Sequence, residues 1–202
     1  MTEKQKAHAG LLFDPDHDPE MMAENASSLE LCSRLNSLAP SKTDRRREIL
    51  CELLGSFGEG SKIESPFHCD FGTNIFVGRD VRIGPLCSIL DGTFVRIGDG
   101  VRIGARCGIH PIGHPLDVKT RLELYEFARA ISIGKGTWVG QGVTILPGVS
   151  IGEGCIIESG SVVTRDIPPN SIAGGDPCRV KGPAKAPEKD GGGECFLDGR
   201  TI

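Results

Sequence analysis

Residues 77–109 read VGRDVRIGPLCSILDGTFVRIGDGVRIGARCGI, and residues 131–163 read ISIGKGTWVGQGVTILPGVSIGEGCIIESGSVV. In both stretches an aliphatic residue returns every six positions, often with glycine after it, apart from a two-residue slip between Ile89 and Ile97. A small or β-branched residue follows most of these positions four residues later, as Val81 and Cys87 do. This double six-residue period is typical of a β-solenoid, in which short strands pack inward and successive coils stack. The twelve aliphatic positions are Val77, Ile83, Ile89, Ile97, Ile103, Ile109, Ile133, Val139, Ile145, Ile151, Ile157 and Val163.

The composition supports a solenoid. Glycine accounts for 28 of the 202 residues, about twice the usual share. In a helix interior each glycine costs about 1 kcal/mol relative to alanine. With three hexads per triangular coil, residues 77–168 predict four coils. The period lapses over residues 110–130, which predicts a long loop leaving the stack, and such loops often carry function.

The ends of the chain differ from the repeat. Apolar residues fall at helical spacing over residues 20–38 and 41–54, and Ser41 with Asp44 fits a capping box. We therefore expect residues 1–58 to form a small helical cap, which protects the strand edges of a terminal coil. Residues 59–182 are expected to form the β-helix domain. Gly, Pro and charged residues over 183–202 predict a flexible tail.

Charge and hydropathy exclude several classes of protein. The 23 Lys and Arg residues against 27 Asp and Glu residues give a net charge of −4, whereas nucleic-acid binders show a basic surface. No apolar run approaches 18 residues and the first ten residues are polar, so we expect no membrane span, no secretory signal and a cytoplasmic location. The eight cysteines form no CxxC pair, which predicts reduced and mostly buried thiols.

Motifs outside the hexads are more specific. They are AGLLFDPDHDPEM (9–21) followed by Leu35-Asn36, CDFGTNIFVG (69–78), GHPLD (113–117), and TWVGQGVTILPGVSIG (137–152) leading to VVTRDIPPNSIAGGDPCRV (162–180). With these motifs the chain resembles the maltose, galactoside and nodulation sugar O-acetyltransferases over nearly all of residues 9–180. The resemblance implies a left-handed parallel β-helix, a homotrimer, acetyl-CoA as co-substrate, a small sugar acceptor and no metal.

Acetyl transfer from a thioester to a sugar hydroxyl needs a base. By resemblance His114 is that general base; the alternative is a solvated loop histidine. A base is often oriented by a carboxylate, and Glu126 matches a frequent acidic position, although Glu123 or Asp117 could substitute and Glu126 could be a solvated surface charge. The resemblance implies transfer by direct attack, without an acyl-enzyme.

Trp138 occupies an outward position of its hexad, where a lone tryptophan needs a partner. It would suit a sugar or the pantetheine arm, as the family's tryptophan does, or it would be buried between subunits. By resemblance the coenzyme follows the last coils, and the backbone N–H of Gln141 falls where the family stabilises the thioester oxyanion. The residues that line this track by resemblance are Gln141, Ser159, Thr164, Arg165 and Arg179.

On the acceptor side the resemblance points to Asp70, to Asp14 with Asp16 close behind, and to Asp91, because carboxylates accept paired hydrogen bonds from sugar hydroxyls. Two departures concern this side. Gly84 stands where bacterial members usually place an asparagine, and Gly113 stands where a threonine commonly precedes the histidine. Gly84 motivates one alternative, a hexapeptide scaffold without catalysis.

A second alternative is a zinc enzyme of the gamma carbonic anhydrase type, which uses three histidines. His68, His110 and His114 are the histidines weighed for it. Their spacing does not guarantee that the three side chains converge.

Overall fold

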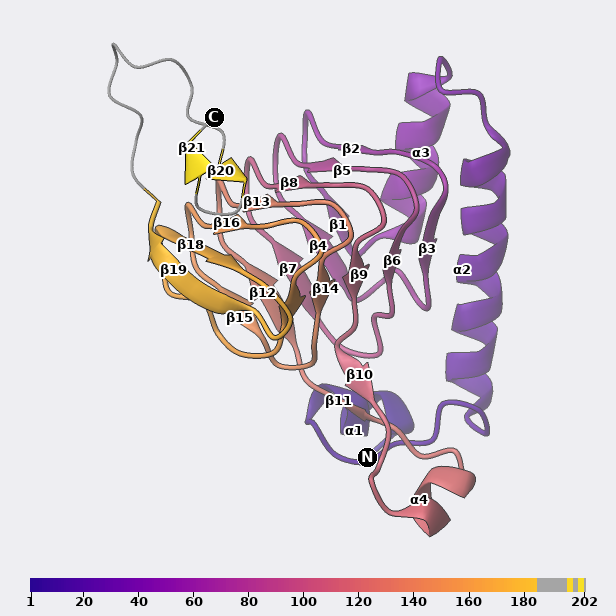
Figure 1. Ribbon diagram of the computed structural model, residues 1–202. Coiled ribbons are helices and arrows are strands. Elements are labelled where there is room, and N and C mark those ends of the chain that lie inside the picture. The colour runs from indigo at the N-terminus through magenta and orange to yellow at the C-terminus, as the bar shows by residue number, and fades with distance from the viewer. Residues whose placement is uncertain (185–195, 198–199, 202) are drawn as a thin grey trace.

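The computed structural model describes residues 1–184, 196–197 and 200–201. Three parallel sheets wrap around a common interior, and the chain visits the first, second and third face in turn before rising to the next coil (Figure 1). The first face consists of β1 (Ser56–Phe57), β4 (Ile75–Val77), β7 (Val95–Ile97), β12 (Ile131–Ile133) and β15 (Ser150–Ile151). The second consists of β2 (Lys62–Ile63), β5 (Arg82–Ile83), β8 (Arg102–Ile103), β13 (Trp138–Val139), β16 (Ile156–Ile157), β18 (Ser171–Gly174) and β19 (Arg179–Pro183). The third consists of β3 (Phe67–Cys69), β6 (Cys87–Ile89), β9 (Gly108–Ile109), β14 (Thr144–Ile145) and β17 (Val162–Val163).

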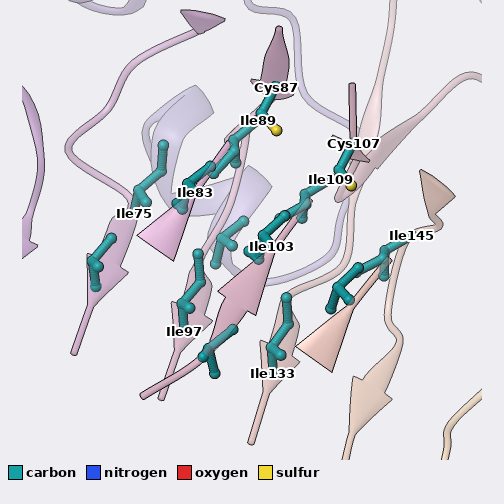
Figure 2. Close-up of a cluster of buried hydrophobic side chains, with 14 of the residues drawn as sticks. Ile75, Ile83, Cys87, Ile89, Ile97, Ile103, Cys107, Ile109, Ile133 and Ile145 are labelled. Carbon is teal, nitrogen blue, oxygen red and sulfur yellow. The ribbon is translucent and has the colours of Figure 1, made fainter. Parts of the chain in front are cut away.

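The hexad positions form the core. All twelve aliphatic residues are at most 4% exposed, which confirms the predicted inward phase. They stack in register from coil to coil; Ile109, for example, pairs with Ile89 on one side and Ile145 on the other. Figure 2 shows these three side chains in one row inside the prism.

The solenoid begins earlier than the sequence predicted. β1, β2 and β3 form a complete coil before residue 77, and β1 already pairs with β4. Phe57, Ile63 and Cys69 keep the six-residue period there, but an aromatic residue and a cysteine replace two of the aliphatic ones. The boundary at residue 59 therefore divides the first coil.

The solenoid also ends later. β19 folds back antiparallel on β18 and runs through Pro183, and the Ala184 N–H donates to the Asn170 carbonyl over 2.7 Å. Residues 183 and 184, which were expected to begin the tail, thus belong to the solenoid. Beyond them the structure describes only β20 (Phe196–Leu197) and β21 (Arg200–Thr201), and the rest of the expected flexible tail lies outside the described residues.

Helices cover the first coil. α2 (Pro19–Ser37) begins at Asp18, whose carboxylate accepts from the Met21 N–H, and α3 (Thr43–Leu53) packs beside it. No side chain caps α3, so the predicted Ser41 box does not form. α1 (Glu3–His8), which the sequence analysis missed, begins with a capping box of Thr2 and Gln5. None of the helices in the described part of the chain is long and apolar enough to cross a membrane.

Residues 110–130 leave the stack. β10 (Ile112–Gly113) and β11 (Phe127–Ala128) pair as an antiparallel hairpin, and α4 (Val118–Leu122) lies at its far end. In Figure 1 the hairpin lies beside α1, with α4 farther from the prism. Phe13 pairs with Glu126 through two backbone hydrogen bonds of 3.0 Å. A second small core holds these segments together; it consists of Ala7, Phe13, Met21, Phe71 and Ala128, with Ile112 against it.

Candidate active site

One edge of the prism collects the residues expected to handle the acceptor. At this edge, which we call the loop edge, the chain passes from the third face to the first. The turn after β3 carries Asp70, the turn after β6 carries Asp91, and the loop after β9 carries His114 and Glu126. Three successive coils therefore bring these residues to one place although they lie up to 56 positions apart in the sequence.

The predicted base and its predicted partner lie at the end of one hairpin. Gly113 and Phe127 are the last paired residues of β10 and β11, and His114 and Glu126 are the next residues outward on the two strands. His114 is exposed, and its ring makes no hydrogen bond within the described part of the chain.

Asp70 and Glu126 are half-buried carboxylates without hydrogen-bond partners among the described residues. Burial raises the pKa of Asp70 to about 6. Burial, and then the charges of Asp70 and Asp16, raise the pKa of Glu126 to about 7. Two such groups in one partly dry site lack hydrogen-bond donors, and sugar hydroxyls or a protonated imidazole would supply them.

The N-terminal segment enters this site through a different aspartate than expected. The Asp14 carboxylate lies 3.0 Å from the His17 ring and also accepts from the His17 N–H. Asp16 is exposed and near enough to Glu126 for its charge to raise the pKa of that carboxyl. The structure thus brings Asp16, rather than Asp14, near Glu126, the predicted partner of His114.

Asp91 does not face the site. Its side chain is fully buried, and its carboxylate accepts hydrogen bonds from the backbone N–H groups of Asp70, Phe71 and Asn74 at 2.9–3.2 Å. Burial raises the pKa of Asp91 to about 7 despite these bonds. The expectation that Asp91 contacts the acceptor is therefore corrected, because no surface of it is open to a ligand.

The alternatives to Glu126 serve other purposes. Asp117 caps α4, and its carboxylate accepts from both the N–H and the hydroxyl of Thr120 at 2.8 Å. Glu123 is the exposed C-cap residue of the same helix. Of the three acidic residues weighed for His114, only Glu126 adjoins the paired positions of the hairpin, as His114 does.

Gly84 lies at another edge, where the chain passes from the second face to the third; we call this the Gln141 edge. A Cβ on Gly84 would come within 2.8 Å of the Ala105 backbone nitrogen, and a Cβ on Gly104 within 2.7 Å of that of Gln141. Gly84 is thus one step of a glycine ladder that lets coils stack closely, and it lies apart from Asp70. The departure from the family asparagine has a packing reason here.

Gly113 has a packing reason as well. A Cβ there would lie 2.6 Å from the ring of Phe127. The aromatic side chain covers the position before His114, so a threonine would not fit without moving it.

The predicted coenzyme residues line the later coils. Gln141 and Ser159 are exposed neighbours at the Gln141 edge, where the Gln141 N–H donates to the Ser159 hydroxyl over 3.1 Å. The hydrogen bond to Ser159 would have to break before the Gln141 N–H could donate to an oxyanion. Thr164 and Arg165 are exposed at the loop edge, one step beyond β17.

Trp138 and Arg179 lie on the second face. Trp138 is 54% exposed and pairs in register with Arg102 and Ile156 of the adjoining coils. Arg179 is exposed in β19 and donates to the Cys178 carbonyl. Within one chain the whole third face separates the Gln141 edge from His114. The structure therefore does not bring His114 together with Trp138, Gln141 or Arg179.

The three histidines weighed for zinc do not converge in one chain. His68 is exposed on β3, whereas burial lowers the pKa of His110, whose ring lies 3.5 Å from the Ser88 hydroxyl. Among the residues that the structure describes, no group of three or more His, Cys, Asp or Glu side chains could hold a metal ion.

The sequence analysis missed two residues near this site, His8 and Asn74. Asn74 is 4% exposed, and its carboxamide lies between Asp91 and the His8 ring. Asn74 stands inside the quoted CDFGTNIFVG motif, so a polar residue ahead of a buried strand was a usable signal. Nothing in the sequence indicated that His8 would reach it.

Comparisons with known proteins agree with this architecture. The maltose acetyltransferase hexapeptide capping motif matches residues 6–58, the six-repeat bacterial transferase hexapeptide matches 130–165, and the hexapeptide repeat of succinyl-transferase matches 94–114. These repeats fit a left-handed β-helix. Nodulation protein L of Rhizobium meliloti is 40% identical over 181 residues, which are 90% of this chain and 98% of that protein.

Two solved structures are similar over nearly their full lengths. A maltose O-acetyltransferase from Clostridium difficile 630 superposes with a TM-score of 0.88 at 35% identity, covering 92% of this chain and 99% of that one. A galactoside acetyltransferase in complex with coenzyme A superposes with a TM-score of 0.86 at 32% identity, covering 94% and 97%. The chain therefore belongs to the maltose, galactoside and nodulation acetyltransferase family of hexapeptide-repeat proteins, and it is an acyltransferase.

Proposed function

We propose that the protein transfers the acetyl group of acetyl-CoA to a hydroxyl of a small sugar, with His114 as general base. The observation that carries this proposal is the loop edge itself. Two half-buried carboxylates without hydrogen-bond partners among the described residues, Asp70 and Glu126, lie there, and the exposed His114 follows the last paired position of the hairpin that Glu126 precedes. Such a site offers acceptors for sugar hydroxyls beside a group that can take a proton at neutral pH.

The chemistry follows from these roles. His114 takes the proton of the sugar hydroxyl as its oxygen attacks the thioester carbonyl. The bond between the carbonyl carbon and sulfur then breaks, and the imidazolium returns the proton to the leaving CoA thiolate. The Glu126 carboxylate holds the ring and stabilises its charged form, while Asp70 accepts hydrogen bonds from the sugar.

The coenzyme would reach this site from a second copy of the chain. Because the third face separates the loop edge from Gln141 and Ser159, we propose a homotrimer in which one copy supplies His114 and its neighbour part of the coenzyme track. The exposed Trp138 would lie against the pantetheine arm or the neighbour, and Arg179 would meet a phosphate as a charge-assisted donor. Thr164 and Arg165 would extend this track.

The test measures release of the CoA thiol from acetyl-CoA with a panel of maltose, glucosides, galactosides and amino sugars. Wild type should acetylate at least one of them, and His114→Ala should lose about 10²- to 10⁴-fold in kcat. His68→Ala is the matched control, because it removes an exposed histidine outside the loop edge.

Equal rates for wild type and His114→Ala would overturn the role of His114. A wild type that binds acetyl-CoA but acetylates no sugar in the panel would overturn the sugar acceptor proposed here. Failure to bind acetyl-CoA at all would favour the scaffold alternative.

A further inference from the structure

The turn that carries Asp70 is built around a buried carboxyl group, that of Asp91. Residues 70–74 wrap over the Asp91 carboxylate of the next coil, with one oxygen accepting from the N–H groups of Asp70 and Phe71 and the other from that of Asn74. Three backbone donors to one carboxylate fix the path of a turn. The position of the Asp70 side chain therefore depends on this arrangement.

Asn74 links the turn to the outside of the prism. Its side-chain amide donates to the Asp91 carbonyl over 2.7 Å. Because the amide nitrogen faces that carbonyl, the amide oxygen points the other way, and it lies 3.0 Å from Nε2 of His8. Because an amide oxygen only accepts, Nε2 of His8 is the donor in this hydrogen bond.

His8 contacts a second turn as well. Its ring packs on that of Phe94, with the ring centroids 4.3 Å apart, and Phe94 lies in the turn after Asp91. The chain then continues to Phe13, which pairs with Glu126 in the loop. Residues 7–13, which we call the N-terminal strap, thus run from the two turns to the hairpin of the loop edge.

We propose that His8 is a positioning residue for the acceptor, acting through Asn74 to hold the Asp70 turn in place. His8 does not contact the reacting atoms; it supplies the outer hydrogen bond of a chain that ends at the Asp70 backbone. We call the hydrogen-bonded chain from His8 through Asn74 and Asp91 to the Asp70 backbone the brace. The role of Asp70 toward the acceptor rests on the proposed function, whereas the brace does not depend on that function.

Asp91→Asn would place an amide against backbone donors, so it risks unfolding the protein and is unsuitable as the main test. Variants of His8 are better suited, because they separate its contact with Asn74 from its contact with Phe94. His8→Phe keeps a ring against Phe94 but removes the donor to Asn74. His8→Gln keeps an N–H donor but removes the ring. Asn36→Ala is the matched control, because Asn36 makes paired hydrogen bonds of 2.9 Å with Phe67 that also tie a helix to the solenoid, but on a strand outside the loop edge.

Two readouts are compared in the full-length protein. The first is the KM for the best sugar of the panel against the KM for acetyl-CoA. The second is hydrogen–deuterium exchange of the backbone amides in residues 70–74 without ligand. For His8→Phe we expect an about five- to tenfold higher sugar KM, an acetyl-CoA KM within about twofold, and exchange in residues 70–74 that is about tenfold faster. His8→Gln should restore both readouts, and Asn36→Ala should lower the melting temperature without changing either.

Unchanged exchange over residues 70–74 in His8→Phe would overturn the brace. Faster exchange with an unchanged sugar KM would overturn the positioning role. If His8→Gln behaved like His8→Phe, the hydrogen bond to Asn74 would not be the operative contact. Should wild type acetylate no sugar, the proposed function fails, and the exchange measurement alone still decides whether the brace exists.

Discussion

At the scale of single residues, the site is defined by carboxylates that folding has left without partners. Glu126 and Asp70 are half-buried, burial raises the pKa of both, and the charge of Asp70 further raises the pKa of Glu126. A protein fold normally avoids such groups unless a ligand or a catalytic partner uses them.

This arrangement predicts an acid limb in the pH profile. With the pKa of Glu126 near 7 and that of Asp70 near 6, both carboxyls gain protons as the pH falls. The ionised forms are the ones that orient His114 and accept from the sugar, so kcat/KM should fall below a pH of about 7. Glu126→Gln should lower kcat about tenfold or more. A flat profile from pH 8 to pH 5.5 in wild type would contradict these roles.

The same charges predict a trade between stability and activity. The folded-state pKa of Asp70 is raised, so folded protein holds this proton more tightly than unfolded chain, and stability falls as the pH rises from about 4 to about 6. At pH 8 the charge is fully present and its burial is uncompensated. Asp70→Asn should therefore stabilise the fold at pH 8 by about 1 kcal/mol, after allowance for the solvent that reaches this group. Thermal unfolding at pH 8 and pH 5 checks this, and the gain should shrink at pH 5.

The site was only partly predictable at this scale. The family resemblance proposed His114, Glu126 and Asp70, and the structure places all three at the loop edge. The resemblance did not distinguish Asp16 from Asp14 or exclude Asp91, because burial and the direction of a side chain depend on contacts between coils that a single sequence does not state.

At the scale of elements, the hexad is the unit of stability. Each strand of two or three residues is too short to be stable alone, and it is held by the strand above and the strand below. In β8 this division is clear, because Ile103 is 4% exposed whereas Arg102 points outward.

Substitutions in β8 should separate the two faces. Ile103→Ala should cost about 2–5 kcal/mol, because it opens a cavity between stacked coils. Arg102→Ala, one residue away on the outer face, should change the free energy of unfolding by less than about 0.5 kcal/mol. Denaturant unfolding of both variants checks the prediction, and equal losses would contradict the assigned phase.

The elements were largely predictable, because an inward residue every sixth position is required by the fold itself. The first strand of the first coil was missed where Phe57 stands in place of an aliphatic residue, and α1 was missed because it is short and polar. α3 begins without the expected cap, since its position is set by packing against α2.

At the scale of the whole molecule, the residues proposed for acetyl transfer lie at two edges of one chain. His114 lies at the loop edge and Gln141 at the other, with a complete sheet between them. Under the proposed function, a second copy would supply the residues that one chain keeps apart.

The oligomeric state is therefore a prediction of the account. Sedimentation equilibrium should give a mass about three times the 21.5 kDa of the chain at concentrations where the enzyme is active. A fully active monomer would contradict a site shared between copies.

The most direct test of the central claim is the steady-state rate of CoA release by His114→Ala beside wild type and His68→Ala, with the preferred sugar at pH 8. We predict that wild type and His68→Ala turn over at similar rates, while His114→Ala, still folded and able to bind acetyl-CoA, falls about 10²- to 10⁴-fold. A folded His114→Ala variant that retains the wild-type rate would contradict the account.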